Sequence, residues 1–375
     1  MAVLLALVHA VNDALTAVLG ALLPMLQARF AAGTATLALL VAVFNVSSSV
    51  TQPLLGALAD GIGLRRVAAG GVALAAVSLS LVGTAPEIFL VVALLAFGGI
   101  GSAALHPVST SIVGGPTAKN PGLAVGLFTA GGMIGFAAGP ILILYLVASR
   151  GTGALPWLML PGLVLALALF VLLPDWQPHG TRLGRFVDRR ALTGTVAWLT
   201  AAATLISLAF ITFTSAVPLW LVTERGLATD HPLLGRTLAA FSLAAGLGAL
   251  LGGAAGARFG YARTTTVSLL AAVLPMLGVL ALPAGPGTVA VAVVAGVLVY
   301  ASQPLLIVAA QNAAPDAPAA TAGIVIGVGN ALAGLLYIPV GAAQGVLGLA
   351  PSMALTFGLL VPAALIARRA LGGVR

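Results

Sequence analysis

The sequence predicts an all-α membrane protein with twelve transmembrane helices, arranged as two pseudo-symmetric six-helix bundles. Of its 375 residues, 61% are hydrophobic and only 6% are charged, too few polar side chains to cover the surface of a water-soluble domain. The apolar runs last about 20 residues, which is long enough to cross a bilayer as a helix. They do not alternate residue by residue as membrane β-strands do. The motif pattern of the first half also recurs in the second.

Six apolar runs make up the first half. They lie near residues 2–27, 34–58, 67–85, 88–113, 121–149 and 154–173. The first run begins at the N-terminus but has no basic segment before it, and it carries His9, Asn12 and Asp13 in its middle. We therefore interpret it as a retained first span and not as a signal peptide.

A polar segment separates the two halves. We predict an N-terminal bundle over 1–173, a cytoplasmic central loop over 174–191 and a C-terminal bundle over 192–375. The runs of the second half lie near 192–222, 233–257, 264–283, 286–313, 319–347 and 349–367. An even number of spans places both termini on the same side of the membrane.

The basic residues predict which side that is. The loops on the side of the termini hold Arg65, Arg66, Lys119, Arg182, Arg185, Arg189, Arg190, Arg258, Arg263, Arg368, Arg369 and Arg375. The opposite side holds only Arg29, Arg150, Arg225 and Arg236. Because Lys and Arg are enriched in cytoplasmic loops, we predict cytoplasmic N- and C-termini in the cytoplasmic (inner) membrane. This distribution accounts for the net charge of +8, so no nucleic-acid partner is expected.

An internal repeat relates the two halves, as expected for a duplicated bundle. The aligned segments are 56–66 with 253–263, which pairs Gly63 with Gly260, and His106-Pro107 with Gln303-Pro304 at the same offset. Pro140 and Pro339 match after a slip of two residues.

The segment 56–66 resembles the signature Gly-x-x-x-Asp-Arg-x-Gly-Arg-Arg of the major facilitator superfamily. The matching positions are Gly56, Asp60, Gly63, Arg65 and Arg66. Gly61 replaces the first Arg of the signature, and Leu64 replaces a later basic position. The resemblance implies the major facilitator fold, with two six-helix bundles around a central cavity.

Other motifs resemble the fosmidomycin-resistance branch of drug exporters within that superfamily. They are His9-Ala-Val-Asn12-Asp13, Gln52-Pro53-Leu-Leu-Gly56, His106-Pro107 followed by Ser109, and Gly131-Gly132 leading to Gly139-Pro140. The chain departs from this branch at Val108 and Asn312, where relatives carry acidic residues. The resemblance implies a secondary active transporter that exports a small amphipathic drug or metabolite in exchange for protons, by alternating access.

Asp13 is the only acidic residue that we place deep within a span. An ionisable group there costs about 3 kcal/mol unless it faces a cavity or a partner, which favours a functional role over a structural hydrogen bond between helices. His9 and Asp13 lie four residues apart, and Asn12 lies three residues after His9, so all three project from one face of the helix. The resemblance adds His106, since the first and fourth spans of the family line the cavity. We predict that Asp13 couples transport to protons, with His9 or His106 as relay or substrate ligand. A packing role at a proline kink is the alternative for His106.

Polar amides within the spans are the candidate substrate contacts. They are Asn12, Asn45, Gln52, Gln303, Gln311 and Asn330. For each of them, packing between helices is the alternative role. No Lys or Arg is embedded in a predicted span, which favours neutral, cationic or weakly acidic substrates over dianions.

The two repeated loops are predicted to act as gates on the cytoplasmic side. The gating candidates are Gly56, Asp60, Gly63, Arg65, Arg66, Arg258, Gly260 and Arg263. A simple positively charged anchor is the alternative. In the fifth span, Gly135, Gly139 and Pro140 are predicted to let neighbouring helices approach closely.

Other function classes receive less support from the sequence. There are no cysteines, and the four histidines lack zinc-ligand spacing, so we expect no metal site and no cofactor. No nucleophile, base and oxyanion donor cluster together, so an enzyme is not expected. A metabolite importer or an uncoupled facilitator remains the alternative, and a transport-inactive receptor-like protein is a remote one. We expect a monomer.

Overall fold

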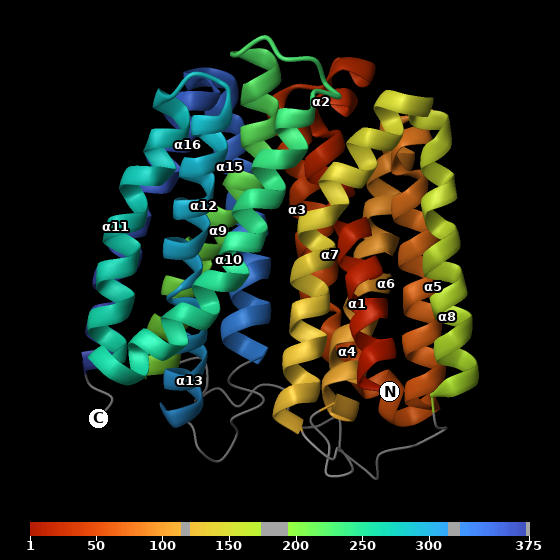
Figure 1. Cartoon of the computed structure of the whole chain (residues 1–375), viewed down its shortest axis with the longest axis horizontal. Coiled ribbons are helices and arrows are strands. Elements are labelled where there is room, and N and C mark those ends of the chain that lie inside the picture. Colours follow the sequence, from red (N-terminus) through yellow and green to blue (C-terminus); the bar gives the residue numbers. More distant parts are fainter. Residues whose placement is uncertain (114–120, 174–193, 314–322, 373–375) are drawn as a thin grey trace. The chain divides into compact units, whose positions relative to one another are not determined.

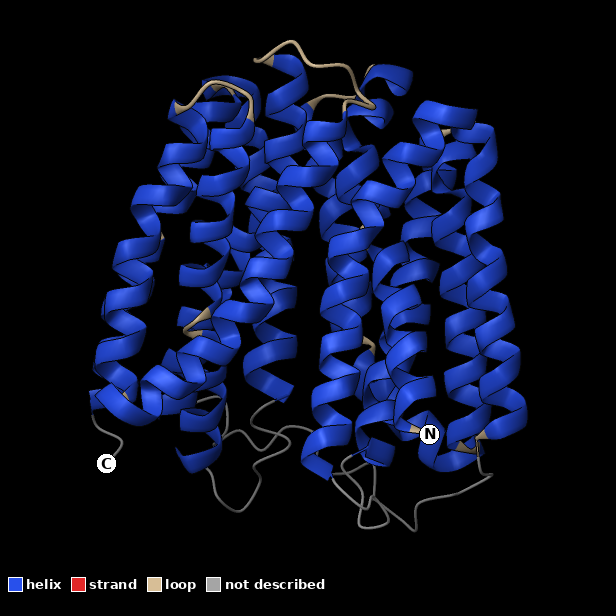
Figure 2. Cartoon of the chain, in the orientation of Figure 1, coloured by secondary structure: helices blue, strands red, loops and turns tan. Residues whose placement is uncertain are grey.

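A computed structural model describes residues 1–113, 121–173, 194–313 and 323–372, and every regular element in them is a helix (Figures 1 and 2). Eleven helical segments of this described part are long and apolar enough to cross a membrane. A shorter apolar helix, α3 (Thr34–Val50), continues into α4 (Gln52–Ile62) through Thr51, whose backbone is also helical. These two helices form the twelfth span. The predicted fold class is confirmed, and the predicted loop 174–191 lies outside the described residues.

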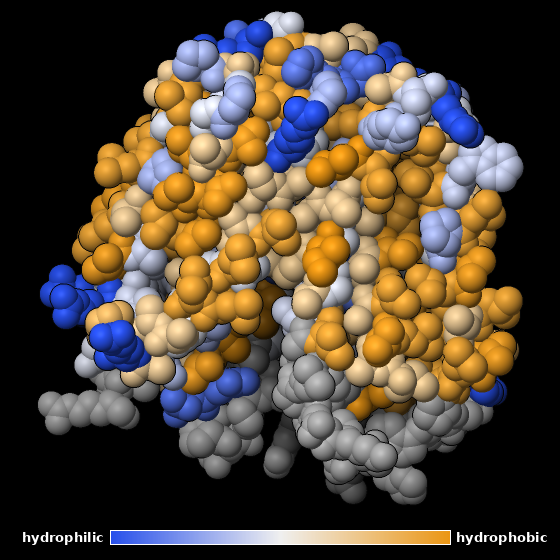
Figure 3. All heavy atoms as spheres, in the orientation of Figure 1, coloured by the Kyte–Doolittle hydropathy of each residue, from blue (hydrophilic) through white to orange (hydrophobic). Residues whose placement is uncertain are grey.

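The surface of the described chain is that of a protein that needs lipid as its solvent. Large apolar side chains point away from the protein along many helices, and Val346, Leu274 and Leu250 are 85%, 76% and 74% exposed. On the face drawn in Figure 3, hydrophobic residues cover the flanks of the helices and hydrophilic residues gather near helix ends. Helices satisfy their own backbone hydrogen bonds, so they can present such flanks to a hydrocarbon environment.

The chain divides into two compact units. The first comprises Met1–Ala32, Val43–Gly184 and Thr229–Gly235, and the second comprises Gly33–Ala42, Arg185–Ala228 and Arg236–Arg375. The first half of α3 belongs to the second unit, where Thr34 donates a hydrogen bond of 2.8 Å from Oγ1 to the Gly341 carbonyl. A Cβ at Gly341 would meet Ala38, so the small residue permits this contact.

The helices of the first unit pack both against neighbours in sequence and against helices further along the chain. The helices are α1 (Ala2–Thr16), α2 (Val18–Phe30), α4, α5 (Leu64–Leu81), η1 (Val82–Thr84), α6 (Ile88–Val113), α7 (Pro121–Arg150), η2 (Thr152–Leu158) and α8 (Met159–Leu172), with the second half of α3. Among the distant contacts, α5 packs against α8, and α1 lies beside α7 (Figure 1) and has its most extensive contact there. This pairing positions the candidate site.

The second unit has the same kind of helical construction. Its helices are α9 (Gly194–Thr223), most of α10 (Pro232–Phe259), α11 (Tyr261–Ala281), α12 (Pro286–Tyr300), α13 (Gln303–Ala313), the π-helix η5 (Ile324–Val328), α15 (Gly329–Leu347), α16 (Leu349–Gly358) and α17 (Leu360–Gly372). Of these, α9 is the most buried and packs against α15, α16 and α17.

Two glycines make equivalent turns in the two units. Gly63 joins α4 to α5 with φ 102° and ψ 138°, and Gly260 joins α10 to α11 with φ 86° and ψ 147°. Residues with a Cβ rarely adopt positive φ, so both positions require glycine. The alignment of Gly63 with Gly260 in the sequence therefore reflects the same backbone geometry.

Prolines interrupt two of the predicted spans. The predicted span 34–58 is two helices, with the break at Thr51, just before Gln52-Pro53. The span 286–313 is likewise broken at Ala301 and Ser302, just before Gln303-Pro304. Proline supplies no N–H for the bond to the preceding turn, and its ring crowds that carbonyl. The sequence indicated these prolines, although not that each would divide a span into two helices.

Glu224, after the end of α9, caps another helix of the second unit. Its Oε1 accepts hydrogen bonds from the backbone N–H groups of Leu349 and Ala350 at 3.1 and 3.4 Å, at the N-terminus of α16. We expect Glu224→Ala to lower the free energy of unfolding by about 1 kcal/mol, because those N–H groups lose their acceptor and the helix dipole loses a favourable charge. Thermal unfolding in detergent measures this.

A matched control for this substitution is Glu87→Ala. Glu87 is exposed, and its side chain forms no hydrogen bond or ion pair with any described residue. Equal unfolding temperatures for the two variants would contradict the capping role of Glu224.

Candidate functional site

Three helices of the first unit, α1, α6 and α7, bring the predicted proton-coupling residues together. The close approach of α1 to α7 depends on glycines that recur every fourth residue of α7, where an added Cβ would meet the α1 backbone. The facing pairs are Gly131 with Ala6, Gly135 with Ala10 and Gly139 with Ala14. Small residues at this spacing allow helices in membranes to pack backbone against backbone. Pro140 follows them inside α7.

The His9 ring is held by a hydrogen bond at its edge and by stacking on its face. Its Nδ1 lies 2.7 Å from the backbone carbonyl oxygen of Phe128 in α7, and its ring stacks on the Phe128 ring at 4.0 Å. A Cβ at Gly132 would collide with the His9 imidazole, so glycine at this position leaves room for the ring. A carbonyl oxygen only accepts hydrogen bonds, so Nδ1 must carry a hydrogen.

Asp13 lies four residues further along α1, and its carboxyl group faces Nε2, the second ring nitrogen of His9. Its Oδ2 is 3.2 Å from Nε2 of His9, an ion-pair distance. Its Oδ1 accepts a hydrogen bond of 3.0 Å from Asn12 Nδ2, which also donates to Ser102 Oγ of α6 at 2.9 Å. Asn12 is 1% exposed, and both hydrogens of its amide are committed to these two partners. The amide therefore holds the carboxylate in place.

His106 completes the cluster from α6. Its ring meets the His9 ring edge to face, with centroids 5.0 Å apart and planes at 88°. Nitrogen and oxygen atoms of His9, Asp13 and His106 all lie within 4.8 Å of one another. A cluster of this size has room for one small cation, either a proton or a metal ion.

The geometry of the His9–Asp13 pair dictates its chemistry. With the hydrogen of His9 held on Nδ1, a neutral ring would turn the lone pair of Nε2 toward a carboxylate oxygen, and two acceptors at 3.2 Å repel each other. The pair is stable when a cation is shared, for example a proton on His9 Nε2 or on Asp13 Oδ2. This arrangement is suited to binding and releasing one proton.

Sequence reasoning missed two members of this cluster. Ser102 lies four residues before His106, so helical spacing would have placed both on one face of α6. Phe128 contributes a backbone carbonyl as well as a ring, and no pattern of residue types indicates such a carbonyl.

The other predicted substrate contacts belong to other helices. Gln52 donates from Nε2 to the Ser48 carbonyl at 3.0 Å, beside the break between α3 and α4. Asn45 lies half-buried on α3, and Gln303 and Gln311 lie half-buried on α13. Asn330, on α15, accepts a hydrogen bond from Ser207 of α9 at 2.7 Å.

The predicted gating residues lie around the two glycine turns. The Arg65 guanidinium lies 5.2 Å from the centre of the Phe170 ring, and Arg66 donates to the Ile62 carbonyl at 3.3 Å. In the second unit, Arg258 lies 5.2 Å from the centre of the Phe259 ring, and Arg263 lines a small pocket beside Gly260. Gly56 lies within α4, and the side chain of Asp60 lies outside the described part.

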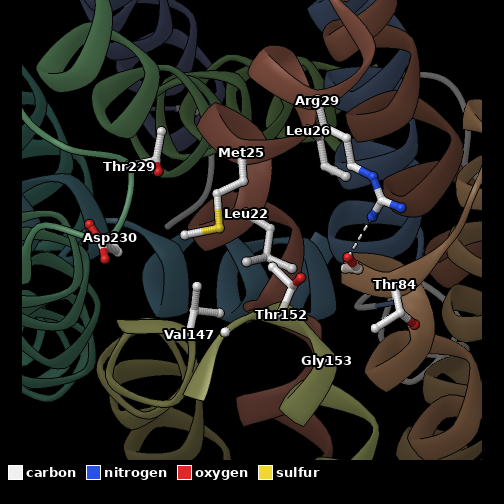
Figure 4. A pocket seen from close by; sticks show the side chains of 12 residues that line it. Leu22, Met25, Leu26, Arg29, Thr84, Val147, Thr152, Gly153, Thr229 and Asp230 are labelled. Atoms are coloured by element: carbon white, nitrogen blue, oxygen red, sulfur yellow. Dashed lines mark hydrogen bonds between the residues drawn. The ribbon is translucent and has the colours of Figure 1, made fainter. Parts of the chain in front are cut away.

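A pocket of about 570 Å³ lies in the first unit, at the end of α2 furthest from the N-terminus (Figure 4). Leu22 and Met25 form part of its apolar wall, and Arg29 and Asp230 line it as charged groups. Arg29 donates to the Gly83 carbonyl at 2.9 Å. Asp13 and Arg29 are sixteen positions apart in sequence, which corresponds to about 24 Å along a helical span. The pocket is therefore distinct from the His9–Asp13 pair.

Comparisons with known proteins agree with this architecture. The family model of the Major Facilitator Superfamily matches residues 5–338. The fosmidomycin resistance protein of Escherichia coli (strain K12) is 25% identical over 340 residues, which cover 88% of this chain and 83% of that protein. The uncharacterized MFS-type transporter YfnC of Bacillus subtilis (strain 168) is 27% identical over 367 residues, covering 94% and 88%.

A solved structure shares the fold. The crystal structure of a bacterial homologue of the human lysosomal transporter Spinster, in an inward-facing and occupied conformation, superposes with a TM-score of 0.83 at 17% identity, covering 98% of this chain and 95% of that one. The resemblance drawn from the sequence motifs is confirmed at the level of the family.

Proposed function

The chain belongs to the major facilitator superfamily of membrane transporters, and from this premise we propose that it exports a small amphipathic compound in exchange for protons. The observation that carries the proposal is the His9–Asp13 pair. His9 Nδ1 donates a hydrogen bond to the Phe128 carbonyl. The other ring nitrogen, Nε2, lies 3.2 Å from Asp13 Oδ2, and these two atoms repel each other unless they share a cation. A proton is the cation that an antiporter of this family would exchange.

In this proposal, the proton moves between water and the pair when the site opens to one side. The Asn12 amide donates hydrogen bonds to Oδ1 of Asp13 and to Oγ of Ser102. These bonds keep the Asp13 carboxyl group in position in both of its protonation states. When the proton is lost, His9 Nε2 and Asp13 Oδ2 repel each other, and this repulsion favours binding of a substrate that can donate a hydrogen bond or supply a positive charge. Alternating access then links proton release to substrate movement.

The substrate class follows from what the spans offer. The fosmidomycin resistance protein is a relative, which makes fosmidomycin, an anionic phosphonate, a contrasting probe. We propose neutral, cationic or weakly acidic amphipathic compounds as the preferred substrates, because the proposed site offers histidines as its only cations. The pocket lined by Arg29 and Asp230 is proposed as a peripheral site that substrate passes at the end of the span.

Several finer assignments also remain proposals. We propose that the protein resides in the cytoplasmic (inner) membrane as a monomer, with both termini cytoplasmic. The loops at Gly63 and Gly260 are proposed to act as gates, with the arginines beside them pairing with neighbouring groups when that side closes. Gln52, Gln303 and Asn330 are proposed as further substrate contacts.

Transport direction is the test of export. Purified protein is reconstituted in liposomes with an imposed pH gradient, and movement of two probes, fosmidomycin and ethidium, is followed. We expect ethidium, a cation of the proposed class, to move in the direction opposite to protons, and fosmidomycin to move more slowly. Movement in the same direction as protons would mean an importer, and movement that ignores the gradient would mean a facilitator.

A metal ion is the competing cation at the pair. The same liposome experiment is therefore repeated with EDTA. We expect unchanged transport, and loss of transport with chelator would contradict the assignment of a proton.

A further inference from the structure

The pocket at the end of α2 has the size of a binding site for a small molecule. Its volume is about 570 Å³, and such sites commonly enclose roughly 300–1,000 Å³. Four stretches of the first unit form its wall: α2, the turn at Gly83, the segment from the end of α7 into η2, and Thr229 with Asp230. Arg29 and Gly151, which line it, are exposed, so a ligand can reach the cavity from outside the protein.

Apolar side chains line the middle of this pocket. Leu22 is buried on α2, and Met25 on the same helix and Val147 on α7 are half-buried. Figure 4 shows these three side chains between Asp230 on the left and Arg29 on the right. An apolar lining favours a ligand whose central part is apolar, because contact removes both surfaces from water.

Arg29 presents a positive charge whose position is fixed. Its Nη1 donates to the Gly83 carbonyl at 2.9 Å, and its guanidinium carbon lies 5.3 Å from the centre of the Phe30 ring. A guanidinium has five N–H donors, and the bond to Gly83 is the only hydrogen bond of this side chain to the described part of the chain. The remaining donors suit a carboxylate or a phosphate, which a guanidinium binds at two points.

Asp230 presents a negative charge that no described residue neutralises. Its side chain is half-buried and forms no hydrogen bond or ion pair with any residue of the described ranges, Arg29 included. The carboxylate does not cap the following helix α10 either, because His231 Nδ1 accepts the hydrogen bond from the backbone N–H of Leu233 at 3.1 Å. A carboxylate that has lost part of its hydration without gaining a partner favours binding of a cation.

We propose that this pocket binds a zwitterion in which a short apolar segment separates an ammonium group from an acid group. The acid group pairs with the Arg29 guanidinium, the ammonium group pairs with the Asp230 carboxylate, and the apolar segment lies against Leu22, Met25 and Val147. A ligand with a single charge leaves one of the two protein charges without a partner, so the pocket discriminates against simple acids and simple amines. The inference rests on the proposed function, in which substrate passes this pocket, and it names the class of substrate that the pocket selects.

The experiment compares three probes that share a six-carbon chain and differ in their charged ends. They are 6-aminohexanoic acid, hexanoic acid and hexylamine, each titrated calorimetrically at neutral pH into the purified full-length protein in a non-ionic detergent. We expect 6-aminohexanoic acid to bind about fivefold more tightly than either of the others, which is the effect of one additional, partly exposed ion pair.

Substitutions of the two charged residues should remove this preference one end at a time. Asp230→Asn should abolish the advantage of 6-aminohexanoic acid over hexanoic acid, and Arg29→Gln should abolish its advantage over hexylamine. Arg29→Lys, which keeps the charge, should retain most of it. Each variant should still bind the singly charged probe that matches its remaining charge, which shows that the pocket is still folded.

Glu87→Gln and Arg150→Gln are the matched controls. Both residues are exposed charged groups of the first unit that do not line the pocket, and their side chains form no hydrogen bond or ion pair with any described residue. Both variants should keep the wild-type order of affinities. Equal affinities of the three probes for the wild type, or a preference that survives both Asp230→Asn and Arg29→Gln, would overturn the proposal.

A soluble compound and a lipid headgroup can both supply this pair of charges. Phosphatidylethanolamine is therefore added to the micelles, with phosphatidylglycerol, which has no amine, as its control. We expect neither lipid to change the affinity for 6-aminohexanoic acid, and a loss of affinity with phosphatidylethanolamine alone would identify the headgroup as the zwitterion in the pocket. Binding needs no proton gradient, so failure of this proposal is distinct from failure of proton coupling, which is measured as flux in liposomes.

Discussion

Replacing Asp13 with asparagine is expected to abolish substrate-driven proton movement while leaving the fold intact. Asparagine has the shape of the carboxyl group but cannot take up or release a proton. The hydrogen bond from Asn12 can persist, since the carbonyl of the new amide also accepts. Proton flux triggered by substrate in liposomes should fall by on the order of 100-fold or more.

Glu87→Gln is the matched control for this variant. Glu87 is an exposed acidic residue of the same unit, and its side chain forms no hydrogen bond or ion pair with any described residue. It should retain substrate-driven proton movement. An Asp13→Asn protein that unfolds at the wild-type temperature and still moves protons fully would refute the role of Asp13.

Replacing Gly132 with alanine is expected to uncouple transport from protons by displacing a single ring. The new methyl group would collide with the His9 imidazole. The ring is already held by the Phe128 carbonyl and ring, so it must leave its position beside Asp13. A small misplacement at a proton-transfer site costs about 10- to 100-fold in rate, and the same flux assay measures it.

The variant Gly135→Ala serves to distinguish loss of coupling from a general loss of helix packing. An alanine there would meet the backbone of Ala10, so α1 and α7 must move apart, which costs about 1–3 kcal/mol of stability. Gly70→Ala, on α5 with open space around it, should instead be neutral or stabilising. We expect Gly132→Ala to impair coupling more than stability, and a wild-type proton flux in that variant would contradict the assigned position of His9.

The fold followed from the sequence because its strongest determinants are local. Apolar runs of span length required helices, and the repeat of Gly63 at Gly260 marked the same turn twice. The division of two spans into shorter helices depends on Pro53 and Pro304, which were visible in the sequence. The grouping of Gly33–Ala42 with the second unit was not predictable, because the contacts of this segment, such as that of Thr34 with Gly341, are with residues distant in sequence.

The candidate site was only partly predictable. Helical spacing placed His9, Asn12 and Asp13 on one face, and family resemblance brought in His106. No pattern of residue types shows that the Phe128 carbonyl occupies His9 Nδ1, yet this contact decides which nitrogen faces Asp13. Likewise, the partner of Asn330 could not be assigned, because Ser207 lies far away in sequence.

The central claim is that one proton on the His9–Asp13 pair is exchanged for substrate. The most direct measurement reconstitutes wild-type and Asp13→Asn proteins in liposomes that contain a pH-sensitive dye, with ethidium as the reporting probe. The account predicts that wild-type protein moves protons opposite to ethidium and that the variant moves none. Ethidium transport without proton movement in the wild type would contradict it and would make Asp13 a binding or packing residue.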